Sequence, residues 1–123
     1  MREMLWVGLG GFLGANARYL LGGWIATRLG PAFPYGTFVI NISGSFILGL
    51  IMGTVEGQVL SPAVRLGLAI GFVGAYTTFS TWTYETMRLI ESGSWLLAAM
   101  NVFGSLAVGM LAVLTGLAAG RGL

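Results

Sequence analysis

Residues Gly71 to Trp82 read G-F-V-G-A-Y-T-T-F-S-T-W, a cluster of glycines, hydroxyls and aromatic rings inside an otherwise apolar segment. Lipid offers no water to a loosened backbone or a bare hydroxyl. Such groups therefore occur at membrane depth only where protein buries them or a wet path runs past. The stretch predicts a helix that is broken inside a membrane-embedded bundle, and it is where function is to be sought.

The composition of the whole chain is that of an integral membrane protein. Of the 123 residues, 56% are hydrophobic and only 8% are charged, whereas soluble domains carry about a quarter charged residues. The mean hydropathy is +0.87, and the apolar segments use nearly the whole length. We therefore expect residues 1–123 to form a single transmembrane domain without a soluble head.

The same composition argues against several functions. A formal net charge of +2 provides too few cations for a nucleic-acid partner. Cysteine and histidine are both absent, which removes disulfides, thiolate chemistry, most zinc sites and imidazole acid–base work. Because no nucleophile–base pair or metal-ligand set is present, we expect that the protein is not an enzyme.

Four apolar segments each approach the ~20 residues that span hydrocarbon. They predict an all-α membrane protein with four transmembrane helices, at approximately residues 4–26, 36–56, 63–90 and 95–119. Short connectors containing Pro and Gly separate them. Glycines four residues apart indicate close helix packing in a compact bundle or oligomer. These pairs are Gly10 and Gly14, Gly49 and Gly53, Gly67 and Gly71, and Gly116 and Gly120.

The arginines do not favour either orientation in the membrane. If all four segments span, three arginines fall on each side of the membrane. Arg2, Arg65 and Arg121 lie on one side, and Arg18, Arg28 and Arg88 lie on the other. With equal numbers of positive charges on the two sides, the positive-inside rule favours neither orientation, and such a chain can insert both ways. The simplest assembly is an antiparallel homodimer with dual topology and twofold symmetry in the membrane plane.

Polar residues recur inside the apolar segments. Asn41 lies in the second segment, where an amide needs partners, and an interhelical hydrogen bond is its simpler role. In the third segment, Gly71, Gly74 and the pair Thr77-Thr78 predict a weakened or broken helix. An unwound turn at that point frees backbone carbonyls, which can coordinate a cation in the middle of the membrane.

Two aromatic residues follow the unwound turn. Phe79 and Trp82 are three residues apart and therefore share a face of the resumed helix. Because ring edges are electropositive, two presented edges favour a small anion without a fixed positive charge. Packing is the alternative role for these rings. In the fourth segment, Asn101 and Ser105 are four apart and place a polar stripe on an apolar helix.

Charged residues inside the segments are further candidates. Glu85 lies far enough inside the third segment to line a wet space, whereas Arg88, nearer the helix exit, is expected to snorkel to the interface. Arg18 is either functional or a simple anchor at the end of the first helix. The sequence leaves the roles of Arg18 and Glu85 open.

Three of these stretches together resemble the Fluc (CrcB) family of fluoride channels. Gly11 to Tyr19 (G-F-L-G-A-N-A-R-Y) is similar to the family's first-helix signature, Gly36 to Gly44 to its second, and Gly71 to Trp82 to its third. The resemblance implies small dual-topology dimers with four helices per subunit and two antiparallel pores. It also implies passive export of fluoride, which relieves fluoride toxicity, across the cytoplasmic (inner) membrane of a bacterium or archaeon.

Carried over residue by residue, the resemblance implies a fluoride pathway. It makes Asn41 an anion-facing amide and Phe79 the first of two pore aromatics. Trp82 becomes the second, where Phe is the family's usual residue, so the width and donor pattern of the pore stay open. Ser105 resembles the family's fourth-helix serine, and the hydroxyl of Thr78 is a further candidate donor for fluoride.

The resemblance also implies a structural cation. Gly74 and Thr77 match positions whose carbonyls hold a sodium ion (Na+) at the centre of the dimer, with Ala75 in place of a frequent glycine. Arg18 and Glu85 match recurrent polar positions of the pathway. Fluoride is small and tightly hydrated, so a path through lipid must replace its water with several donors at once while still allowing release.

Two other classes of function remain open at this point. A proton-coupled small multidrug or guanidinium exporter is also a dual-topology four-helix protein. It needs a carboxylate deep in the membrane, however, and only Glu85 could serve. A non-transporting bundle that merely assembles would need neither Asn41 nor the threonine pair. Passive flux that rejects chloride would distinguish a channel from both.

Overall fold

Every regular element of this chain is helical. The computed structural model describes residues 1–123. The elements are α1 (Arg2–Leu29), α2 (Tyr35–Gly53), α3 (Pro62–Leu66), η1 (Gly67–Val73), α4 (Gly74–Tyr76), α5 (Phe79–Glu91), α6 (Trp95–Ala99), η2 (Met100–Gly104) and α7 (Ser105–Arg121). The two segments η1 and η2 are π-helical, and each joins its neighbours through residues in the right-handed helical conformation.

Three helical segments are long and apolar enough to cross a membrane: Tyr35–Gly53, Pro62–Glu91 and Trp95–Arg121. The protein is therefore a multi-pass membrane protein. The sequence predicted four such segments, and α1 is not among the three although it has 28 residues. Its middle is less apolar because it carries Asn16 and Arg18 between several glycines.

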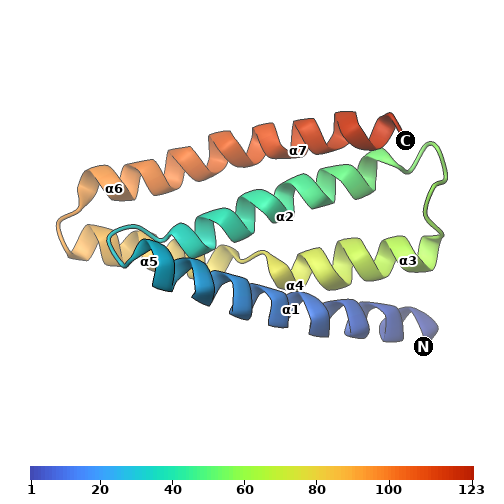
Figure 1. The fold of residues 1–123 in the computed structure, drawn as a ribbon, viewed down its shortest axis with the longest axis horizontal. Coiled ribbons are helices and arrows are strands. Elements are labelled where there is room, and N and C mark those ends of the chain that lie inside the picture. The colour runs from blue at the N-terminus through green and yellow to red at the C-terminus, as the bar shows by residue number, and fades with distance from the viewer.

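The helices pair in a simple way. Figure 1 shows α2 and α7 lying side by side along most of their length, while α1 lies against α3, η1 and α4. Both termini and the connector after α2 lie at one end of the bundle. The connectors that follow α1 and α5 lie at the opposite end.

Both pairings depend on direct contact between backbones at glycines. A Cβ atom on Gly14 of α1 would collide with the Phe72 carbonyl oxygen, and one on Gly116 of α7 would collide with the Phe46 carbonyl oxygen. The predicted packing role is confirmed for all the paired glycines, where an added Cβ would lie 3.1 Å or less from a neighbouring backbone atom: Gly10, Gly14, Gly49, Gly53, Gly67, Gly71, Gly116 and Gly120.

Helix α2 ends earlier than the sequence predicted, at Gly53 rather than at residue 56. Thr54 is buried, and its hydroxyl donates to the Ile51 carbonyl at 2.6 Å. The Thr54 carbonyl in turn accepts from the Val59 N–H at 3.4 Å. These bonds turn the chain out of the helix before the connector begins.

Between α4 and α5, Thr77 and Thr78 have extended backbones, with ψ angles of 156° and 117°. The Thr77 N–H and hydroxyl both donate to the Val73 carbonyl, at 3.0 and 2.9 Å, where α4 ends. Helix α5 begins with Thr78 as its N-cap, and the Thr78 hydroxyl accepts from the Thr81 N–H at 3.2 Å. We refer to Thr77–Thr78 as the interruption, and the candidate site surrounds it.

Candidate functional site

A side chain from α2 supports the interruption. Asn41 Oδ1 accepts from the Thr78 N–H at 2.8 Å, and Asn41 Nδ2 donates to the Thr78 carbonyl at 3.1 Å. The amide thus satisfies both backbone groups of an extended residue that has left its helix. The simpler role, an interhelical hydrogen bond, is therefore confirmed. One Nδ2 hydrogen remains for a further acceptor.

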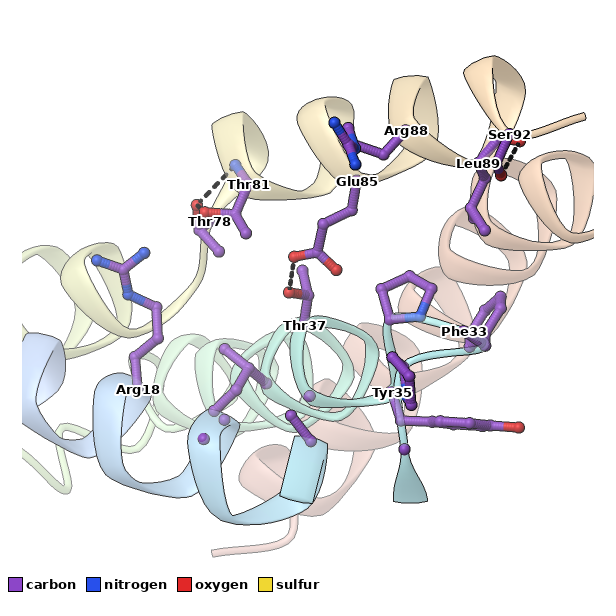
Figure 2. A pocket seen from close by; sticks show the side chains of 18 residues that line it. Arg18, Phe33, Tyr35, Thr37, Thr78, Thr81, Glu85, Arg88, Leu89 and Ser92 are labelled. Atoms are coloured by element: carbon purple, nitrogen blue, oxygen red, sulfur yellow. Dashed lines mark hydrogen bonds between the residues drawn. The ribbon is translucent and has the colours of Figure 1, made fainter. Parts of the chain in front are cut away.

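A cavity of about 610 Å³ lies next to the interruption, and Figure 2 shows it from close by. Helix α1 contributes Arg18, and α5 contributes Thr81 and Glu85. The Glu85 carboxylate accepts a hydrogen bond from the Thr37 hydroxyl of α2. Arg18 is half-buried, whereas Arg88, three residues after Glu85 in α5, is exposed. This first cavity therefore brings cations, a carboxylate and hydroxyls together.

A second cavity, of about 310 Å³, holds the other predicted groups. The ring centroids of Phe79 and Trp82 are 5.5 Å apart, and the ring planes meet at 50°. Phe79 is 74% exposed, so its ring is open to an occupant or a neighbouring chain. The predicted pathway residues that line this second cavity are Asn41, Thr78, Phe79, Trp82 and Ser105.

Thr78 lines both cavities. Arg18 and Glu85 line only the first cavity, and the remaining predicted pathway residues line only the second. All the residues that the sequence placed on a pathway are thus gathered around two cavities that share one threonine.

The indole N–H of Trp82 does not stand free. It donates to the backbone carbonyl of Asn101 in η2 at 3.1 Å. The sequence left open which donors Trp82 would bring to the cavity. In the structure its one N–H is directed to the fourth helical segment.

The two residues predicted to hold sodium lie at the two ends of α4: Gly74 begins this helix and Thr77 follows its last residue. Gly74 is exposed and lines neither cavity, whereas Thr77 is half-buried and lines the second. Among the backbone hydrogen bonds at turns and caps, none reaches the carbonyl oxygens of Gly74 or Thr77. No group of three His, Cys, Asp or Glu side chains is placed to hold a metal ion. A cation here would therefore depend on backbone oxygens.

Sequence reasoning did not assign two of the lining residues, Thr37 and Thr81, which both face the first cavity. Thr37 lies four residues before Asn41, and Thr81 lies four residues before Glu85. Residues at this spacing share a helix face. The spacing was therefore a signal that could have found both.

The fold and the site together define a small helical membrane protein in which hydroxyl, amide and aromatic groups surround two neighbouring cavities. A family model described as "CrcB-like protein, Camphor Resistance (CrcB)" matches residues 5–117. The chain belongs to this CrcB family.

Named relatives match it over nearly the full length. A protein of Acidobacterium capsulatum named "Fluoride-specific ion channel FluC" is 52% identical over 120 residues, which cover 97% of this chain and 96% of the relative. Proteins with the same name from Geotalea daltonii and Chloroflexus aurantiacus are 47% and 44% identical, and the matches cover 98% of this chain. They cover 98% and 97% of those relatives.

Proposed function

We propose that this protein is a passive, fluoride-selective ion channel. It lets fluoride leave the cell across the cytoplasmic membrane and so relieves fluoride toxicity. The names of its relatives support an ion channel rather than an enzyme or a proton-coupled exporter. The structural observation that carries the proposal is the pair of polar-lined cavities beside the interruption, which share the lining residue Thr78.

The first cavity suits the approach of a hydrated anion. Arg18 supplies a positive charge that attracts it. The hydroxyls of Thr37 and Thr81 offer contacts of the kind that water makes. Glu85 is held by Thr37, so its carboxylate is turned toward α2.

The second cavity suits an anion that has lost much of its water. The free Nδ2 hydrogen of Asn41 and the hydroxyl of Ser105 can donate to fluoride, and the ring edges of Phe79 and Trp82 add weaker positive contacts. No charged side chain lines this cavity. Binding there stays weak enough for release, which conduction requires.

The functional unit that we propose is an antiparallel, dual-topology homodimer with two pores. Each subunit crosses the membrane four times, α1 included, and its third helix is broken at mid-membrane. Three observations support this assembly: the balanced arginines, the termini at one end of the bundle and the exposure of Gly74 and Phe79 at the interruption. A second subunit would cover those exposed residues.

We further propose that the Gly74 and Thr77 carbonyls of both subunits hold a structural Na+ at the centre of the dimer. Backbone oxygens at an extended turn are suitable ligands for this ion. Bound there, Na+ would supply a fixed positive potential at depth without placing a cation in the pore. Its contribution would be structural and electrostatic.

Fluoride efflux from liposomes that contain the purified protein tests the channel. We expect fluoride to leave down its gradient without a pH gradient, while chloride, loaded in parallel, is retained. Empty liposomes are the control. Liposomes that stay impermeable, or that release fluoride only when a proton gradient drives it, would contradict the proposal, and the second result would favour the exporter.

Exchange of the cation tests the sodium site. Replacing Na+ with N-methylglucamine at equal ionic strength should shift the detergent-solubilised protein from dimer toward monomer, because the larger cation cannot fit between carbonyls. The measurement is light scattering on a sizing column at several dilutions. Identical dissociation in both salts would argue against a site at Gly74 and Thr77.

A further inference from the structure

We infer that Asn101 is a positioning residue of the pathway: it fixes the orientation of the Trp82 ring, so that the indole N–H is withheld from the second cavity. This inference rests on the proposed function, because it takes the second cavity to be the path of the anion. Asn101 lies in η2 and lines neither cavity. Any effect it has on an ion must therefore act through other residues.

The position of Asn101 is unusual for an amide in this protein. Its exposed fraction is 1%, the lowest among the buried polar residues. A polar side chain so far from water needs hydrogen-bond partners. Every buried side-chain nitrogen and oxygen in the structure has such a partner, and for Asn101 the partners lie around Trp82.

The contacts form a closed loop. The indole N–H of Trp82 donates to the backbone carbonyl of Asn101 at 3.1 Å. Asn101 Nδ2 donates to the Thr86 hydroxyl at 2.9 Å, and that hydroxyl donates to the Trp82 carbonyl at 2.8 Å. Trp82 and Asn101 are thus joined twice, once through the ring and once through Thr86.

This double connection restrains the ring. Turning the indole about its side-chain torsions would separate the N–H from the Asn101 carbonyl and leave a half-buried donor without its partner. The second connection, through Thr86, links η2 to the backbone of α5. The N–H of the ring is therefore kept bonded to η2, whereas a freely turning indole would offer the cavity a strong donor.

The same amide contacts a second lining residue. The Ser105 hydroxyl lies 3.5 Å from Asn101 Oδ1, toward which it donates. Ser105 and Trp82 both line the second cavity. Asn101 is therefore connected to two groups that would meet the ion: to the Trp82 ring through its backbone carbonyl and to Ser105 through its amide oxygen.

The first arm of the test is spectroscopic and does not depend on conduction. Replacing Trp6, Trp24 and Trp95 with Phe leaves Trp82 as the sole tryptophan of the four in the chain. The ultraviolet resonance Raman band of the indole N–H then reports its hydrogen bond. We expect Asn101→Leu and Thr86→Val to shift this band toward a weaker hydrogen bond, and Thr86→Ser, which keeps the hydroxyl, to leave it in place.

Thr115→Val is the matched control for Thr86→Val. Thr115 is exposed, and its hydroxyl donates only to carbonyls of its own helix, those of Leu111 and Ala112, at 3.0 Å. The band should not move in this variant. Because Asn101 is buried and Asn101→Leu could fail to fold, Thr86→Val tests the same connection from a less buried position.

The second arm measures fluoride efflux in a double-substitution design. Asn101→Leu keeps the backbone carbonyl that accepts from the indole N–H but removes the amide that holds this carbonyl in place through Thr86. Loss of that buried hydrogen bond predicts a roughly tenfold slower efflux in the chain with Trp82. In the Trp82→Phe chain, the same substitution should change efflux much less relative to its own parent, because Phe has no N–H to be held.

Equal losses in the two backgrounds would overturn the inference, and so would a Raman band that stays unchanged in both Asn101→Leu and Thr86→Val. If the unsubstituted protein carries no fluoride, the proposed function fails. The Raman band would still report whether Asn101 orients the ring, so the two failures are distinguishable.

Discussion

At Asn41, one amide makes two hydrogen bonds to the backbone of Thr78 and keeps one N–H for another acceptor. Supporting the interruption and donating to an ion are therefore compatible roles for this side chain. A substitution that keeps the acceptor oxygen and removes the donors retains one of the two bonds to Thr78 and abolishes donation to an ion.

Asn41→Asp is that substitution. The carboxylate can still accept from the Thr78 N–H, but it loses the bond to the Thr78 carbonyl, lacks N–H donors for an ion and repels an anion. We expect the protein to fold and fluoride efflux to fall at least about tenfold. A tenfold change corresponds to about 1.4 kcal/mol, which is less than the energy of one charge-assisted hydrogen bond. Asn16→Asp is the control, because Asn16 is exposed and donates only to the Phe12 carbonyl of its own helix. Unchanged efflux in Asn41→Asp would remove Asn41 from the pathway.

The sequence could identify the kind of residue at this scale but not its partner. An amide inside an apolar segment is conspicuous, so Asn41 was easy to find. Its contact with Thr78 joins residues 37 positions apart, which no local pattern encodes. The bond from Trp82 to Asn101 was hidden for a further reason, because its acceptor is a backbone carbonyl that every residue possesses.

At the scale of helices, the spacing of glycines predicted close packing, because a missing Cβ every fourth residue leaves a groove along one face. The π-helical segments η1 and η2 were not predicted. A widened turn has no residue signature of its own and depends on the packing around it. Packing also decides which helices pair, so the match of α2 with α7 had to come from the structure.

Gly14→Ala tests the crossing of α1 with η1. The added Cβ would collide with the Phe72 carbonyl oxygen, and overpacking of this kind costs about 1–3 kcal/mol. We expect a lower melting temperature for the detergent-solubilised protein. Gly8→Ala in the same helix is the control, because an added Cβ there meets nothing within 4 Å. Equal melting temperatures for the two variants would show that this crossing is loose.

At the scale of the whole molecule, a single chain leaves much of its apolar surface uncovered. Only 18 of 123 residues are buried, so lipid and neighbouring protein must cover the rest. The sequence predicted an all-helical membrane protein because its composition allows little else. Orientation and assembly are harder to predict, since balanced charges leave the topology undecided and one chain does not define its partner.

The absence of cysteine makes the topology directly testable. Ala32→Cys and Gly57→Cys place single thiols in the exposed connectors after α1 and α2, which lie at opposite ends of the bundle. If the chain inserts both ways, a membrane-impermeant thiol reagent applied to intact cells should label about half of each variant, as balanced charge implies. Labelling confined to one variant would establish a single orientation and contradict the antiparallel dimer.

Residues 1 and 123 emerge at the same end of the bundle (Figure 1). Two copies fused in tandem in one polypeptide would therefore insert in the same orientation. Inserting the second copy in the opposite orientation would require a linker that itself crosses the bilayer once. Any attempt to build a one-chain version of the opposed pair must therefore supply an additional hydrophobic helix between the repeats.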